Sequence, residues 1–176
     1  MPLTHALFVT TSASAVQEIA VKSPVFTNMG KIPVKYTADG ANINPPLTLS
    51  KIPDLTRSIV IIVEDPNAPV DTWVHWLVWD ILPTTKISEG MIPGIEGVNA
   101  FNEHRYKGPC PPADTRNYFF KVYALDKLLQ LHCRSVKYDV MKAMKDHVVG
   151  YGELIGTYKR SNIIQVSSHA TPDIYI

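Results

Sequence analysis

The sequence has little of several features that would narrow its class. It contains only two cysteines, Cys110 and Cys133, and they form no Cys-x-x-Cys pair, which argues against a zinc knuckle or a dithiol redox motif. No run of eighteen apolar residues occurs, so the sequence predicts no transmembrane helix. With 17 basic and 16 acidic side chains the formal net charge is +1. The overall charge therefore favours neither nucleic acid nor an anionic membrane surface.

The N-terminal part also lacks the features of a secretory signal. Its apolar stretch, residues 6–9, is short, and no lysine or arginine precedes it. We therefore expect a cytoplasmic protein whose two cysteines stay reduced. Residues 1–20 are rich in threonine, serine and alanine, and we expect them to form a loosely attached N-terminal extension.

The composition is that of a globular protein of one domain. Hydrophobic residues make up 45% of the 176 residues and charged residues 19%, which argues against disorder. Fourteen prolines outnumber nine glycines, and the prolines stand between apolar runs rather than inside them. This pattern is typical of a sheet protein with fixed turns. We place the domain at residues 21–160.

Short apolar segments between turn signals predict an all-β sandwich. The expected strands centre on residues 47–50, 59–64, 73–81, 118–125 and 153–159. One helix is predicted over residues 136–149, with Ser135 as its cap and Gly150 after its end. Residues 161–176 contain the β-prone run 163–166, which we expect to pack as a C-terminal strand or arm, on the sandwich or on a second copy in a homodimer.

The most informative stretch places an acid and a histidine around a proline-locked turn. Asp65 follows the β-branched run 59–63, which predicts a strand buried on both faces. Strict alternation along the next strand puts His75 on one face with Trp73, Leu77 and Trp79. His75 is therefore expected between indole rings, beside a rigid pocket wall.

A second stretch supplies further candidates. The Gly-Pro-x-Pro-Pro loop at residues 108–112 cannot be helix or inner strand, and its backbone can line a cavity. Arg116 and Tyr118 share one face if the next strand begins there. Cys110 is better explained as a small buried residue than as a nucleophile, because no histidine is tied to it in sequence.

Motifs along residues 24–160 resemble the phosphatidylethanolamine-binding proteins, in the small bacterial and archaeal branch called Raf kinase inhibitor-like. The motifs are, in order, Lys35-Tyr36-Thr37-x-Asp39-Gly40, Pro45-Pro46-Leu47, Asp65-Pro66-x-Ala68-Pro69, His75-Trp76, Gly108-Pro109-x-Pro111-Pro112, the run 118–126, and Gly156-Thr157-Tyr158. The resemblance implies an antiparallel Greek-key β-sandwich with one or two peripheral helices. It also implies a cis peptide bond before Pro69.

The resemblance further implies a pocket for a small anion, such as a phosphate or a phospholipid head group, with no cofactor, and partners among kinases or serine proteases. The positions that it assigns to ligand binding are Asp65, Pro69, His75, Gly108, Pro109, Arg116 and Tyr118. Two positions depart from the family pattern, because Asn67 replaces a second acid and Arg116 replaces a second histidine. Either these changes make the pocket more attractive to anions, or Arg116 pairs with Asp65 and fills the site.

We therefore predict a non-enzymatic ligand-binding protein, with His75 near its reference pKa of about 6.5 and anion binding that strengthens from pH 8 to pH 6. One alternative is a serine protease inhibitor that acts through a surface loop, with the pocket incidental. Another is a hydrolase of unknown type, which the lack of a Gly-x-Ser-x-Gly motif disfavours. A metal site built from Asp65, His75 and His104 would require three groups to converge by chance, so we predict none.

Overall fold

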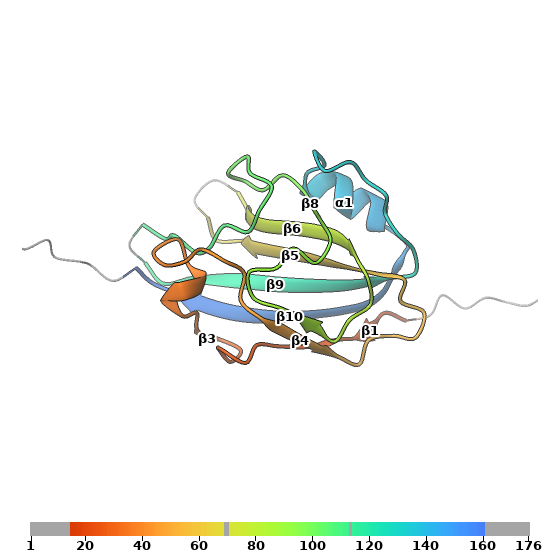
Figure 1. Ribbon diagram of the computed structural model, residues 1–176, viewed down its shortest axis with the longest axis horizontal. Helices are drawn as coiled ribbons and strands as arrows, with labels where there is room; N and C mark the ends of the chain where they lie inside the picture. Colours follow the sequence, from red (N-terminus) through yellow and green to blue (C-terminus); the bar gives the residue numbers. More distant parts are fainter. Residues whose placement is uncertain (1–14, 69–70, 113, 161–176) are drawn as a thin grey trace, which may run out of the picture.

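The computed structural model describes residues 15–68, 71–112 and 114–160. A seven-stranded sheet and a three-stranded sheet pack face to face, and one α-helix lies outside them (Figure 1). The elements are β1 (Gln17–Glu18), β2 (Ala20–Lys22), β3 (Gly30–Lys31), the 3-10 helix η1 (Val34–Tyr36), β4 (Leu47–Ser50), β5 (Ser58–Asp65), β6 (Trp73–Ile81), β7 (Lys86–Ile87), β8 (Ile95–Glu96), β9 (Arg116–Leu125), α1 (Lys137–Met144) and β10 (Val148–Tyr158).

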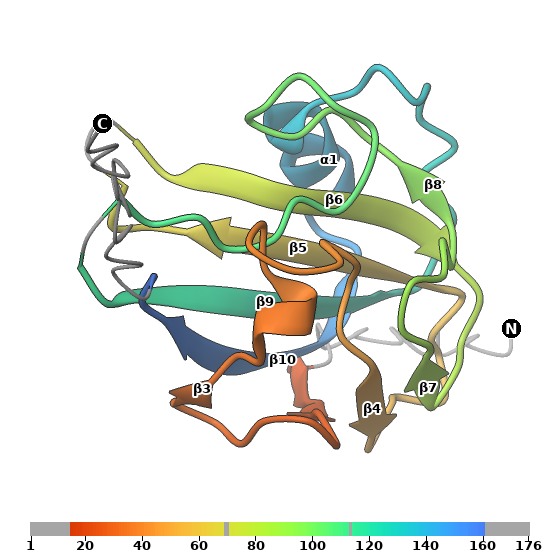
Figure 2. The ribbon, with the colours of Figure 1, turned by 60° about the vertical axis from the view of Figure 1, so that its left-hand side comes forward.

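The larger sheet has the order β1-β10-β9-β5-β6-β8, with β3 also paired to β10, and the smaller sheet has the order β2-β4-β7. The long strands β10, β9, β5 and β6 pair antiparallel, while the short strands β1 and β3 run parallel to β10. Figure 2 shows β4 and β7 in front of the larger sheet and α1 behind it. The predicted β-sandwich with a peripheral helix is confirmed, and its long strands are antiparallel as expected, but β1 and β3 make the larger sheet mixed.

Strand β5 lies at the centre of the larger sheet and is buried along its whole length. Ile61 and Val63 face the core between the two sheets, whereas Val60 and Ile62 face the second core beneath α1. This arrangement explains the unbroken β-branched run, because both faces of the strand are covered. The sequence prediction for this strand is confirmed.

Strand β6 departs from strict alternation at His75. Val63 pairs with Trp76 but Glu64 pairs with Val74, so His75 is an extra residue in a β-bulge. As a result Val74 packs in the core beneath α1 and not with Trp76, which lies between the sheets. The predicted single face from Trp73 to Trp79 is therefore wrong. The extra residue shifts the alternation by one position, so residues before the bulge and residues after it no longer follow one alternating pattern.

Helix α1 is shorter than predicted. Its N-cap is Val136, whose N–H donates to Asp139 Oδ2 at 3.0 Å, so the predicted cap at Ser135 is wrong. Residues 148–150, expected in or directly after the helix, open strand β10 because they pair with the end of β9. Val140 and Met144 are buried against the sheet, as the helical period requires.

The N-terminal boundary of the domain lies earlier in the chain than predicted. Strands β1 and β2 and the buried Ile19 lie within or next to the predicted extension 1–20 and belong to the sandwich, so the core begins earlier than residue 21. The predicted C-terminal arm, residues 161–176, lies outside the described residues. Within the described ranges, no helix has both the length and the apolar character needed to cross a membrane.

Candidate functional site

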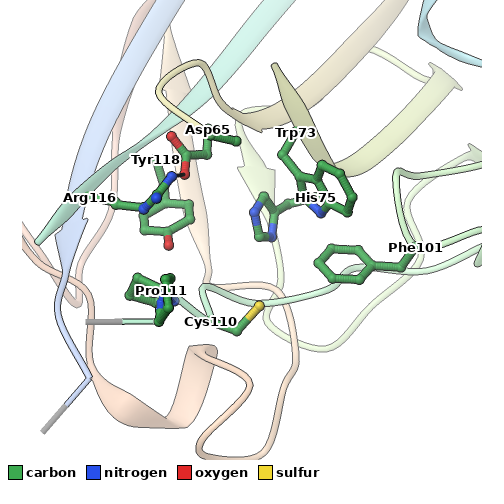
Figure 3. A pocket seen from close by; sticks show the side chains of 10 residues that line it. Asp65, Trp73, His75, Phe101, Cys110, Pro111, Arg116 and Tyr118 are labelled. Carbon is green, nitrogen blue, oxygen red and sulfur yellow. Dashed lines mark hydrogen bonds and ion pairs between the residues drawn. The ribbon is translucent and has the colours of Figure 1, made fainter. Parts of the chain in front are cut away.

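A cavity of about 260 Å³ opens where β5 ends and β6 and β9 begin (Figure 3). Antiparallel pairing brings these three strand ends together, because the end of one strand lies beside the start of its neighbour. The lining residues are Asp65, Ala68, Trp73, His75, Phe101, Cys110, Pro111, Pro112, Arg116 and Tyr118. Four of the predicted site residues, Asp65, His75, Arg116 and Tyr118, therefore meet at one cavity.

Arg116 and Asp65 form an ion pair at the cavity wall. Arg116 Nη1 lies 3.1 Å from Asp65 Oδ2 and also donates to the carbonyl oxygen of Asn67 at 2.8 Å. The second carboxylate oxygen of Asp65 accepts the N–H of Asn67 at 2.9 Å. The Asp65 side chain is only 4% exposed, so it needs this cation. One sequence hypothesis is that Arg116 pairs with Asp65 and fills the site. The ion pair does form, but a cavity remains beside it.

His75 is buried, and one hydrogen bond identifies the ring nitrogen that carries the proton when the ring is neutral. Its Nδ1 lies 2.7 Å from the carbonyl oxygen of Lys107, which can only accept, so Nδ1 carries the proton. In the neutral ring Nε2 is therefore an acceptor. The ring packs edge-on against Phe101 and Tyr118, with centroids 5.5 and 5.2 Å away, and not between indoles as predicted.

Burial lowers the pKa of His75 below its ordinary value of 6.5, although the carbonyl of Lys107 and the charge of Asp65 oppose this effect. The prediction of an unperturbed His75 pKa is therefore wrong. The sequence could not show it, because the desolvation comes from side chains that are distant along the chain, such as Phe101 and Tyr118.

This shift makes the stability of the protein depend on pH. The unfolded chain begins to bind a proton at His75 near pH 6.5, whereas the folded chain does so only at lower pH, so the free energy of unfolding should decrease as pH falls from 7 through that range. His75→Asn keeps an N–H donor for Lys107 but removes the titration. Urea unfolding in chloride buffers should show a shallower decrease for this variant, and equal slopes for both proteins would contradict the assignment.

Gly108 and Pro109, which were predicted to bind the ligand, do not line the cavity. The N–H of Gly108 donates to Asn42 Oδ1 at 2.7 Å, and the carbonyl of Pro109 accepts the N–H of Ala38 at 3.0 Å. The N–H of Gly108 is therefore already used within the protein. These residues instead attach the proline-rich loop to the segment that follows η1. Pro69, with its predicted cis peptide bond, lies outside the described residues.

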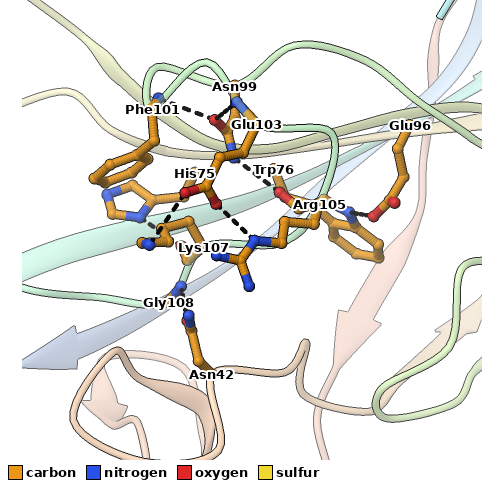
Figure 4. A network of polar contacts seen from close by, with 10 residues as sticks. All are labelled: Asn42, His75, Trp76, Glu96, Asn99, Phe101, Glu103, Arg105, Lys107 and Gly108. Atoms are coloured by element: carbon orange, nitrogen blue, oxygen red, sulfur yellow. Dashed lines mark hydrogen bonds and ion pairs between the residues drawn. The ribbon is translucent and has the colours of Figure 1, made fainter.

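Phe101 is the lining residue that sequence reasoning missed entirely. It belongs to a tight turn in which Asn99 Oδ1 accepts the N–H groups of Phe101 and Glu103, and Asn99 Nδ2 donates to the carbonyl of Arg105 (Figure 4). The asparagines of this turn are a local signal for a loop. Nothing in the sequence indicates that the loop reaches His75.

Cys110 lines the same cavity, and it is only partly exposed. Burial raises the pKa of its thiol, which keeps it protonated and weakly nucleophilic. Burial likewise raises the pKa of the Tyr118 hydroxyl, so this group is a hydrogen-bond donor at neutral pH. Among the described residues, no three His, Cys, Asp or Glu side chains stand close enough together to hold a metal ion.

The fold and the site define a β-sandwich with an aromatic-walled cavity that is lined by a buried aspartate paired with a partly exposed arginine. A model of the phosphatidylethanolamine-binding protein family matches residues 22–159, and the chain belongs to this family. It is 46% identical to a UPF0098 protein of Pyrococcus horikoshii over 149 residues, which cover 78% of this chain and 75% of that protein. It is 39% identical to a UPF0098 protein of Methanothermobacter thermautotrophicus, covering 80% and 98% of the two chains.

Two solved structures have the same fold. A phosphatidylethanolamine-binding protein homologue from Chlamydia trachomatis superposes with a TM-score of 0.79 at 35% identity, covering 82% of this chain and 99% of that one. Escherichia coli YbcL, described as a new member of the mammalian family, superposes with a TM-score of 0.75 at 25% identity, covering 81% and 99%. The family resemblance inferred from the sequence motifs is therefore confirmed.

Proposed function

We propose that this protein is a non-enzymatic ligand-binding protein whose cavity takes a small anionic group, such as the phosphate of a phospholipid head group. The observation that carries the proposal is the convergence of Arg116, Tyr118 and His75 on one cavity. The hydrogen bonds that Arg116 makes with described residues all use Nη1, so its Nε and Nη2 groups remain as donors for a ligand. The family match supports a head-group ligand.

The charges around the cavity favour a ligand that carries its own proton. Asp65 offsets Arg116, and a neutral His75 adds no charge, so the lining is close to neutral at pH 7. Nε2 of the neutral ring can accept a hydrogen bond from the O–H of a monoprotonated phosphate. Sulfate has no such proton at these pH values. Its binding should therefore strengthen only at a pH below 6.5, where His75 becomes charged.

The same groups support binding rather than catalysis. Nδ1 of His75 is bonded to a backbone carbonyl and not to an orienting carboxylate, and the thiol of Cys110 has a raised pKa. The described lining thus supplies no activated nucleophile. Modulation of a kinase or a serine protease stays a prediction from the family resemblance. We also propose a cytoplasmic location, with which the two free cysteines among the described residues are compatible.

Calorimetric titration with methyl phosphate and with sulfate near pH 6 tests the proposal. Arg116→Gln should weaken both by at least about tenfold, because a charged hydrogen-bonding partner is lost. Arg134→Gln, at an exposed arginine before α1, is the charge-matched control and should bind as the wild type does.

Circular dichroism should confirm that each variant is folded. If Arg116→Gln does not fold, Arg116→Lys keeps a cation beside Asp65 but loses the planar fork, and it should still weaken binding. Undiminished affinity in either folded variant would show that this cavity is not the anion site.

A further inference from the structure

A second cavity, of about 270 Å³, is lined in part by Arg105 and Tyr106. It shares no lining residue with the first cavity. The lining residues that matter for its chemistry are Ile43, Asn44, Met91, Ile92, Glu96 and Arg105. None of them belongs to the site proposed above.

Glu96 supplies a carboxylate that forms no ion pair with any residue that the structure describes. Its Oε1 accepts the indole N–H of the buried Trp76 at 2.7 Å (Figure 4), and its Oε2 has no hydrogen-bond partner among the described residues. Burial raises the pKa of Glu96, against the effects of the Trp76 hydrogen bond and of His104. The ionised form is therefore incompletely compensated, and a cation bound here would stabilise it.

The nearby cation, Arg105, is already paired. Its Nε lies 2.6 Å from Glu103 Oε2, and Glu103, which lies outside the lining, is also 3.4 Å from Lys107 Nζ. Glu96 is thus the one carboxylate among the lining residues, and it forms no ion pair with Arg105. Asn44 adds a neutral acceptor to the same wall. Its Nδ2 donates to the carbonyls of Pro45 and Ser88, which leaves its Oδ1 available.

The mouth of the cavity is apolar. Met91 and Ile92 are 59% and 65% exposed, and Ile43 packs at the edge of the core beside them. Two adjacent large apolar side chains with such exposure offer a surface for a methylene chain. The site therefore combines a carboxylate and an amide oxygen with apolar side chains.

We propose that this second cavity binds a small primary alkylammonium ion, with its –NH₃⁺ group on Glu96 and its alkyl chain against Met91 and Ile92. An ammonium carries three donors and no acceptor, which matches a wall of carboxylate and amide oxygens. The volume limits the ligand to a small molecule, since cavities for drug-sized ligands begin at about 300 Å³.

The probe is hexylammonium chloride, added to the full chain while the indole N–H resonance of Trp76 is followed by NMR. This N–H contacts Glu96 directly and reports on the carboxylate. Hexanol, the neutral analogue, should shift it little. Across methyl-, butyl- and hexylammonium, affinity should rise up to about fourfold for each methylene that becomes buried.

Glu96→Gln keeps an acceptor for Trp76 but removes the charge, and it should weaken hexylammonium binding at least about tenfold. Glu89→Gln is the matched control, because Glu89 is already bound by Lys35 and Tyr36 and does not line the cavity. Met91→Ser, with the carboxylate intact, should reduce the gain with chain length. Equal binding of hexanol, or unchanged affinity in Glu96→Gln, would overturn the proposal.

Discussion

Replacing Asp65 by Asn should strengthen sulfate binding in the first cavity by at least about a hundredfold. A buried carboxylate about 5 Å from a unit negative charge opposes it by roughly 3 kcal/mol at an effective dielectric constant of 20, and sulfate carries two such charges. The substituted amide would keep the shape of the site, and Arg116 would retain its hydrogen bond to the carbonyl of Asn67. Arg116 should therefore stay at the cavity wall with its charge no longer offset. Calorimetric titration of the two proteins at the same pH measures the change.

Asn67→Asp provides the opposite change in charge on the same turn, and sulfate should bind this variant more weakly than the wild type. Asn67 is exposed, so the added carboxylate should have a smaller effect than the buried Asp65. A folded Asp65→Asn protein with unchanged or weaker sulfate binding would mean that the carboxylate is required to position the guanidinium.

Gly108→Ala should reduce the free energy of unfolding by about 3 kcal/mol, a value typical of severe overpacking. A Cβ atom at this position would lie 2.6 Å from the Cα of Thr37 and 2.6 Å from the carbonyl oxygen of Tyr36. Both are backbone atoms, so the neighbour cannot relax by changing a rotamer. The clash would also pull the Gly108 N–H away from Asn42. Urea denaturation measures the loss.

Gly90→Ala separates this clash from the general effect of replacing a glycine. Gly90 has φ of +64°, but the nearest atom to an added Cβ is Ile43 Cδ1 at 3.6 Å. This variant should lose only about 1 kcal/mol, from backbone strain alone. Similar losses in the two variants would show that the loop at Gly108 moves aside without cost.

The sequence predicted the longer strands well because their signals are local, but it missed the strands of two or three residues, which are β1, β2, β3, β7 and β8. The expected strands at 47–50 and 73–81 coincide with β4 and β6, and the buried run 59–64 lies within β5. Helix α1 was predicted too long because a valine at position 148 fits a helical period and a strand equally, and only pairing with β9 decides between them.

The site was predictable only in part, because local sequence signals place strand ends but do not show which distant segments contact them. Asp65 and Arg116 stand at strand ends that antiparallel pairing brings together. By contrast, the bulge at His75, the approach of Phe101 and the hydrogen bond that occupies Gly108 all depend on contacts between distant parts of the chain. No local pattern in the sequence encodes them.

The parallel strands β1 and β3 limit how this protein can associate with itself. They occupy opposite ends of the outer side of β10, at residues 150–151 and 156–157, and the segment before β3 adds bonds to Ile155. Little backbone of this strand is left to template a further strand. A second copy could extend the sheet along β10 only by displacing β1 or β3. This pairing therefore disfavours edge-to-edge growth into fibrils from this side of the sheet.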